Sequence, residues 1–209
     1  MVEIPRTPST AKRLELERRA FLDLLRMTNT MAAPEAIARQ LVVLARYLSG
    51  CEAVAIRLKV GPGFPYAAGL GFPEPFLAQE DDLCARGEDG HLLRDTRRQP
   101  ILDCLCGRVL TGRVDRTQPC FTDRGSFVTP STSDLLASVS APQTLGPTRN
   151  RCHVAGYETV GLFPICREGV TYGLIQCNDP RPGRLTAGSI DLIENLASAA
   201  SNLFQQAMA

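Results

Sequence analysis

The sequence lacks an excess of charge of either sign. Its 23 Lys and Arg residues nearly balance 22 Asp and Glu residues, which leaves a formal net charge of +1. Binding to a phosphate backbone or to an anionic lipid surface depends on a surplus of cationic side chains. The chain therefore has no general attraction to nucleic acid or to a membrane surface, and we expect neither as a partner.

Long apolar runs and the Cys-x-x-Cys pair are also missing. No window approaches the roughly 18 apolar residues of a membrane span, and the start MVEIPR lacks the order of a signal peptide. We therefore expect a cytoplasmic protein whose eight cysteines are reduced, because a chain of 209 residues can bury its own core without a disulfide framework. Without a Cys-x-x-Cys pair, a structural zinc site is not expected.

The signatures of the common enzyme classes are absent as well. The sequence contains no P-loop, no G-x-S-x-G elbow, no H-E-x-x-H and no kinase signature. Only two histidines could supply an imidazole ligand, His91 and His153. His91 lies in a charged loop and is expected to be solvated. His153 precedes a predicted strand, where it is either an ordinary polar residue or a contact to a ligand or metal.

The first fifty residues predict two helices. Residues 1–10 form a flexible lead. A helix follows in which Leu14, Phe21 and Thr28 recur every seven residues, with Leu24 and Met31 interleaved. This seam fits either packing on the chain's own domain or a homodimer. Pro34 opens the second helix and Gly50 ends it. We divide the chain into residues 1–32, a lead and connecting helix, and residues 33–209, the main domain.

Two hairpins are predicted further along. The strand CEAVAIRL (residues 51–58) leads through the turn at residues 61–63 into residues 64–71. Residues 157–166 and 170–179 are β-rich and are joined by Arg167-Glu168-Gly169, which predicts a tight hairpin. This turn would set Cys166 opposite Thr171 and Cys177 opposite Val160. Thr186 caps a last helix that runs almost to residue 209.

The region between the hairpins has little regular structure. Residues 73–98 read as a long loop with short helical turns, and Pro100 opens a helix that ends at Gly112. A short strand and a helix beginning near Ser131 or Ser133 follow. The order of elements predicts an α+β fold, an antiparallel sheet with helices on one face. An irregular region of about 80 residues is too long for a connection and is expected to wall a pocket.

The order of elements, the strand CEAVAIRL and the ending from Gly156 to Gln205 together resemble GAF domains, the small-molecule sensor modules of signalling proteins. The resemblance covers about residues 30–206. It implies a sheet of five or six antiparallel strands with a ligand cavity on one face. On the other face it implies helices that join neighbouring signalling domains, such as kinase domains. It therefore implies a non-catalytic sensor that transmits occupancy through its terminal helices.

The cysteine-bearing stretches LDCLCGRV and RNRCHVAGYETV are similar to GAF domains of multidomain histidine kinases. Some members of the wider superfamily hold a tetrapyrrole, which implies haem here, with a bilin as second choice. Cys106 or Cys152 would be the covalent anchor, and His153 an axial or pocket contact. The Cys152-His153 step followed by Tyr157 resembles the attachment site of phytochrome-like GAF domains.

Cys104 and Cys106 lie two residues apart on the predicted helix. Successive side chains turn by about 100° there, so the two sulfurs are expected to point to nearly opposite sides. One would face the core and the other would line the cavity, with Cys106 favoured for the cavity. As an alternative function, free methionine sulfoxide reductases share the GAF fold and use loop cysteines. In that class the chain would be a redox enzyme or thiol switch (Cys84, Cys104, Cys106 or Cys120).

Overall fold

The structure is a computed structural model that describes Leu22, residues 33–138 and residues 148–208. The predicted N-terminal helix and its heptad seam lie outside the described residues, except for Leu22. The proposed division between residues 32 and 33 therefore stays a prediction. No helix of the described residues is both long and apolar enough to cross a membrane.

One antiparallel sheet of five strands organises the domain, in the order β2-β1-β5-β4-β3. The two predicted hairpins are present, since β1 pairs with β2 and β4 pairs with β5. Pairing of β1 with β5 joins the hairpins in the centre of the sheet. The strands are β1 (Ala53–Leu58), β2 (Tyr66–Leu70), β3 (Phe127–Thr129), β4 (Thr159–Arg167) and β5 (Val170–Asp179).

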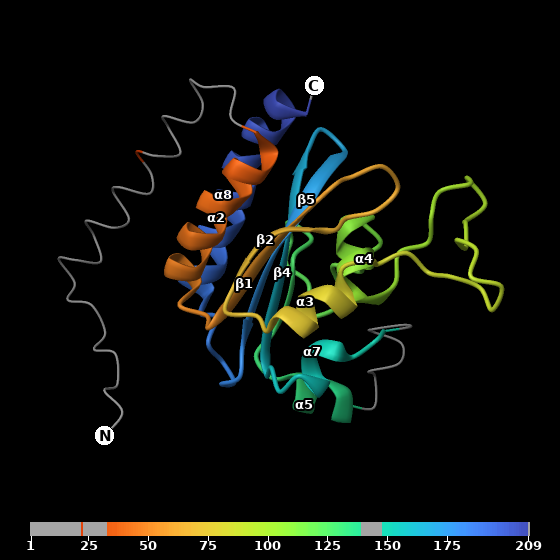
Figure 1. Cartoon of the computed structure of the whole chain (residues 1–209). Helices are drawn as coiled ribbons and strands as arrows, with labels where there is room; N and C mark the ends of the chain where they lie inside the picture. Colours follow the sequence, from red (N-terminus) through yellow and green to blue (C-terminus); the bar gives the residue numbers. More distant parts are fainter. Residues whose placement is uncertain (1–21, 23–32, 139–147, 209) are drawn as a thin grey trace.

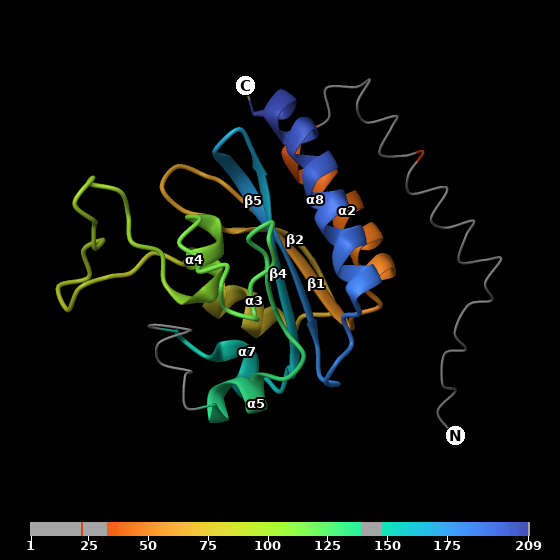
Figure 2. The ribbon, with the colours of Figure 1, turned by 180° about the vertical axis from the view of Figure 1, so that it is seen from behind.

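Two long helices, α2 (Pro34–Ser49) and α8 (Ala187–Ala207), pack side by side on one face of the sheet (Figures 1 and 2). The predicted end of α2 and the predicted start of α8 are both confirmed. Gly50 adopts φ 64° and donates its N–H to the carbonyl of Arg46, which closes α2. Thr186 and Ser189 form a capping box that begins α8.

The alternation of side chains along each strand divides the core into two layers. Val54 and Ile56 of β1 face α2 and α8, as do Ile175 and Cys177 of β5. Ala53, Ala55 and Leu174 face the opposite layer. The small side chains of β1 leave that layer room for other segments.

Short helices and irregular chain cover this second face (Figure 2). Residues 81–103 contain isolated bridges rather than strands. The predicted α+β fold class is therefore confirmed, although helices lie on both faces. The covering helices are α3 (Glu74–Glu80), α4 (Cys104–Leu110), α5 (Thr132–Ala137) and α7 (Arg151–Val154).

Two details of the sequence prediction were wrong. The helix predicted from Pro100 begins only at Cys104. In the second hairpin Cys166 does lie opposite Thr171, but Cys177 lies opposite Gly161 and not Val160. An irregularity between Ile165 and Cys166 shifts the register by one residue, because the extra residue of a bulge has no partner on the facing strand.

Candidate functional site

A cavity of about 40 Å³ lies between the sheet and its cover. Its walls come from segments far apart in the sequence, namely α4, α5, α7, and strands β3 and β4. The lining is largely apolar, and its polar members are thiols, hydroxyls, an imidazole, Asn150 and Arg151. Four predicted site residues meet here: Cys104, Cys106, Cys152 and His153.

Both cysteines of the Cys104-Leu105-Cys106 sequence line this cavity, contrary to the prediction that their sulfurs would point apart. Cys104 is the first residue of α4 and adopts φ 64°, a left-handed conformation that L-residues rarely adopt. The prediction assumed a regular helix through both residues. The left-handed backbone at Cys104 instead turns its sulfur toward Cys106.

Gly107 allows α4 to pack closely against the preceding chain. A Cβ atom at this position would lie 2.5 Å from the carbonyl oxygen of Leu102, closer than real Cβ contacts allow. Cys106, which precedes it, is consequently held in the core with 6% of its surface exposed. The glycine after the second cysteine thus permits the close approach of α4 to Leu102.

Hydrogen bonds converge on the sulfur of Cys104. The Cys106 thiol donates to it, as do the Thr148 hydroxyl and the backbone N–H groups of Arg149 and Leu105. The Thr148 oxygen lies 3.5 Å from this sulfur. These donors hold the pKa of Cys104 well below its usual value, despite burial, because they stabilise the thiolate. The pKa of Cys106 is raised well above its usual value by its hydrogen bond to Cys104 and by burial.

Cys152 and His153 enter the cavity from α7. Burial raises the pKa of the Cys152 thiol to about 12, which a hydrogen bond with Asn178 offsets only in part. Gln176 Nε2 donates to the Cys152 sulfur at 3.6 Å. His153 Nδ1 lies 3.1 Å from the Thr132 hydroxyl, so this ring nitrogen is engaged within the protein.

Tyr157, predicted to contact a cofactor, lies outside the lining of this cavity. Its ring packs against Phe72 and Phe76 at centroid distances of 5.4 and 5.9 Å. Burial raises the pKa of its hydroxyl to about 12. In this arrangement Tyr157 is a core residue that supports the cover.

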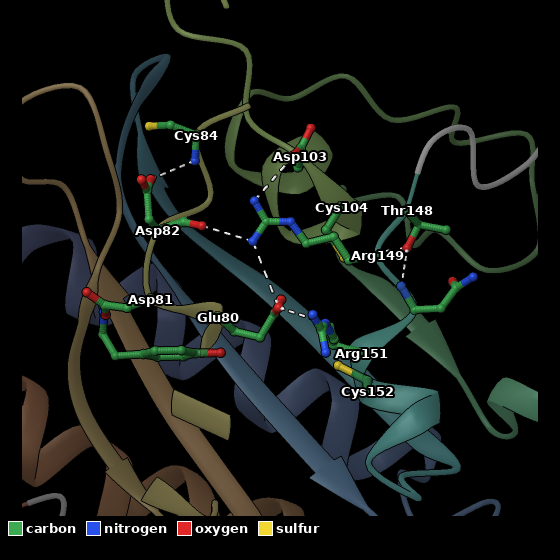
Figure 3. Close-up of polar contacts among 12 residues, drawn as sticks. Glu80, Asp81, Asp82, Cys84, Asp103, Cys104, Thr148, Arg149, Arg151 and Cys152 are labelled. Atoms are coloured by element: carbon green, nitrogen blue, oxygen red, sulfur yellow. Dashed lines mark hydrogen bonds and ion pairs between the residues drawn. The ribbon is translucent and has the colours of Figure 1, made fainter. Parts of the chain in front are cut away.

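Arg149 and Arg151 tie the α7 segment to the rest of the cover (Figure 3). Arg149 donates to the Asp82 carbonyl at 2.9 Å and to Asp103 Oδ2 at 3.2 Å. Both arginines also lie within 3.8 Å of Glu80 Oε1. Burial raises the pKa of Glu80, and the two arginines oppose that rise.

A buried polar group that contacts the cover was missed by the sequence analysis. The guanidinium of Arg57 is fully buried, stacks 3.6 Å from the Tyr66 ring centre, and donates to the backbone carbonyls of Phe64, Glu80 and Asp81. Tyr66 in turn donates its hydroxyl to Gln176 at 2.9 Å. The signal was present, because the polar residue Arg57 breaks an otherwise apolar strand.

The other predicted cysteines are separate from this site. Cys84 and Cys120 are buried but do not line the cavity. Figure 3 shows the Cys84 sulfur pointing away from Cys152. His91 is exposed, as predicted, and its backbone N–H bonds to Asp89.

The residues present do not fit a tetrapyrrole in this arrangement. A drug-sized ligand needs a site of about 300 Å³ or more, and a tetrapyrrole is larger still. The volume of the cavity is about 40 Å³, and Nδ1 of His153 is already hydrogen-bonded to the Thr132 hydroxyl. Among the described residues no three His, Cys, Asp or Glu side chains are grouped so as to hold a metal ion.

Solved structures with a similar arrangement include GAF domains. One is the GAF domain of a phosphoenolpyruvate-protein phosphotransferase from Coxiella burnetii, with a TM-score of 0.59 and 14% identity over 96% of this chain and 97% of that one. A domain described as that of a two-component sensor histidine kinase from Sinorhizobium meliloti gives 0.55 and 16% identity, over 85% and 94% of the two chains.

The chromophore-binding domain of a bacteriophytochrome from R. palustris gives a TM-score of 0.56 and 12% identity, over 93% of this chain and 62% of that one. No family model and no curated protein sequence matches the chain. At these identities the likeness establishes the fold. The chain has the fold of GAF domains.

Proposed function

We propose that this chain is a non-catalytic sensory domain of a signalling protein. It binds a small ligand in the cysteine-lined cavity and transmits occupancy through α2 and α8. The observation that carries the proposal is the convergence of Cys104, Cys106 and Cys152, from two separate segments, on one cavity of the sheet face opposite α2 and α8. The GAF fold supports the same function, since solved structures with this fold include a sensor kinase domain.

A route from the cavity to α8 supports transmission. Phe127 of β3 lines the cavity, and the preceding residue, Ser126, donates its hydroxyl to Glu194 of α8 at 2.7 Å. Thr122 donates to the same carboxylate oxygen at 2.6 Å, and Arg124 donates to Asn195 at 2.7 Å. We call these contacts of residues 122–126 with α8 the β3 latch. A ligand that displaces Phe127 would alter the latch and bias the position of α8.

The size of the cavity limits the ligand. A water molecule needs at least roughly 10–15 Å³ of such space, so 40 Å³ accommodates about three. The proposal is therefore a ligand of a few heavy atoms. Haem or a bilin remains a prediction that requires α5 and α7 to move apart.

The alternative, a methionine sulfoxide reductase, has less support. Free methionine sulfoxide is several times larger than the cavity, and Cys84 and Cys120 do not line it. Attached kinase domains and a homodimer through the terminal helices belong to the proposed sensory function. Each would use α2 or α8, the long helices on the face away from the cavity.

The proposed function is tested by filling the cavity and observing α8. Methyl methanethiosulfonate adds a small thiomethyl group to accessible thiols, and intact mass verifies its incorporation. We expect the NMR amide signals of Glu194 and Asn195 to shift when the cavity thiols carry this group. The control variant carries serine at the three cavity cysteines and keeps the exposed Cys166. The proposal is wrong if labelled wild type shows shifts only in the cavity walls, or if the control shifts equally.

A further inference from the structure

We infer that Cys104 is a hydrogen-peroxide-reactive thiol whose oxidation ends in a disulfide with Cys106. This goes beyond the proposed function, because it assigns a chemical reaction to two residues whether or not α8 responds. The reaction is stoichiometric, one turnover per molecule, so it does not make the chain an enzyme.

The surroundings of Cys104 stabilise a thiolate in contact with the cavity. Its sulfur accepts hydrogen bonds from one thiol, one hydroxyl and two backbone N–H groups, which come from α4 and from residues 148–149. Convergence of several donors is what activates a cysteine, because the thiolate and not the thiol is the nucleophile. These donors lower the pKa of Cys104.

The second sulfur is already in place. Cys106 lines the same cavity two residues further along α4, and its side chain interacts with that of Cys104. This proximity depends on the left-handed backbone of Cys104, with φ 64°. Strained conformations of non-glycine residues cluster at functional sites, where the surrounding structure holds them. Cys152 also lines the cavity, but its sulfur is hydrogen-bonded to Gln176 and Asn178 on the sheet instead.

The cavity selects a small oxidant. Its 40 Å³ holds about three water molecules, which is enough for hydrogen peroxide and too little for an organic hydroperoxide with a long alkyl chain. Thr148 and the backbone N–H groups of residues 105 and 149 are donors that can also stabilise the departing hydroxide.

The two steps balance. The Cys104 thiolate attacks one peroxide oxygen, an S–O bond forms, the O–O bond breaks, and hydroxide leaves and takes up a proton to give water. The Cys106 thiol then gives up its proton, and its sulfur attacks Cys104. The S–S bond forms, the S–O bond breaks, and the second hydroxide leaves as water with that proton. Two thiols lose two electrons, and one peroxide becomes two waters.

Peptide mass spectrometry tests the assignment directly. Reduced protein is treated with one equivalent of hydrogen peroxide without oxygen, denatured, alkylated with iodoacetamide and cleaved after arginine. The peptide of residues 99–108 contains Cys104 and Cys106 and no other cysteine. We expect this peptide to carry no alkyl group and to have a mass two hydrogen atoms below that of the reduced peptide. A doubly alkylated peptide 99–108, or one linked to the peptide that carries Cys152, would overturn the inference.

Variants separate the two roles. Cys106→Ala should leave the Cys104 sulfenic acid without a partner, so that dimedone labels Cys104 at near stoichiometry. Cys104→Ser should lose both the label and the disulfide, whereas Cys166→Ser, a change at an exposed cysteine, should behave as wild type. Cys104 should react about tenfold faster than Cys166 at neutral pH. Equal rates of thiol oxidation in wild type and Cys104→Ser would contradict the assignment. If a variant fails to fold, the peptide analysis of the wild-type protein decides alone.

Discussion

At the scale of single residues, the site depends on a buried charge whose two terminal nitrogens are paired with backbone carbonyls. Arg57 is the largest fully buried side chain, and it holds three backbone carbonyls where the loop after β1 meets the end of α3. Removing one partner of a buried hydrogen bond lowers the stability of the protein by far more than the bond contributed in net terms. The group left behind stays desolvated and unpaired. Arg57 therefore fixes the floor of the cover.

Arg57→Ala is expected to lower the free energy of unfolding by about 3 kcal/mol, since three buried carbonyls lose their donors. Urea denaturation followed by circular dichroism measures this change. The matched control is Arg86→Ala. Arg86 pairs with Asp82, and both side chains are about half exposed, so the change should be much smaller than that of Arg57→Ala. Equal losses in the two variants would contradict the structural role of Arg57.

Asp179 gives a pH-dependent contribution of known sign. Burial raises the pKa of this carboxylate, but hydrogen bonds from Arg181 and from the backbone of Glu52 outweigh burial, and the pKa is lowered overall. A group with a depressed folded pKa stabilises the protein above its unfolded pKa. That contribution is lost as the pH falls through the folded value.

Asp179→Asn is therefore expected to cost about 2 kcal/mol at neutral pH, discounted for the exposed Arg181 side chain. The difference from wild type should shrink once the pH falls below about 4, the ordinary range of an aspartate. Urea unfolding at several pH values measures it. Glu168→Gln, at an exposed ion pair, is the control and should show almost no change. A difference that does not depend on pH would contradict the linkage.

Sequence reasoning singled out Cys104, Cys106, Cys152 and His153, and all four line the cavity, while their role toward a ligand stays a prediction. The predicted geometry of Cys104 was wrong. The left-handed φ of Cys104 was not predictable, because a non-glycine residue adopts it only when surrounding contacts hold it there. Tyr157 likewise belongs to an aromatic cluster that has no sequence signature.

At the scale of elements, the β3 latch connects the cavity side of the sheet to α8. Ser126 is buried at 1% exposure and Glu194 at 7%, so their hydrogen bond is shielded from water. We expect a double-mutant cycle of Ser126→Ala and Glu194→Ala to give a coupling energy of about 1 kcal/mol. The parallel cycle of Arg124→Ala with Glu194→Ala should give a smaller coupling energy. The Arg124 side chain is half exposed, and its Nε lies 3.6 Å from Glu194 Oε2. A Ser126–Glu194 coupling of zero would exclude the latch.

Element boundaries were predictable where local chemistry determines them. Pro34, Gly50 and Thr186 correctly marked the ends of α2 and the start of α8, because caps and the left-handed position are local requirements. The register of β4 and β5 was predicted correctly only up to the bulge at Ile165 and Cys166. A bulge depends on how the strand packs against its neighbours, so turn chemistry alone cannot locate it.

At the scale of the whole molecule, the fold was predictable and the volume of the cavity was not. Periodicity and the order of elements predict the sheet and its layers, whereas cavity volume depends on how every side chain of the cover packs. The prediction that haem binds here came from the resemblance of the sequence to tetrapyrrole-binding domains and not from any cavity volume. The cavity of 40 Å³ has no room for it without movement of the cover.

A haem titration tests this conclusion. Purified protein mixed with haemin should show no saturable shift of the Soret band, and His153→Ala should give the same spectrum as wild type. A stoichiometric Soret shift that His153→Ala abolishes would show that α5 and α7 open and that the haem prediction was correct. Cys166→Ser is the control for haemin bound at an exposed thiol.

Communication between the cavity and α8 is tested by hydrogen exchange across the β3 latch. Backbone amide exchange of α8 is measured before and after thiomethylation of the cavity cysteines, in wild type and in Glu194→Ala. We expect modification to change exchange near Glu194 at least about threefold in wild type and to leave it unchanged in Glu194→Ala, since loss of the carboxylate removes the latch. Unchanged exchange of α8 in modified wild type, or an equal response in both proteins, would show that the latch does not carry a signal from the cavity.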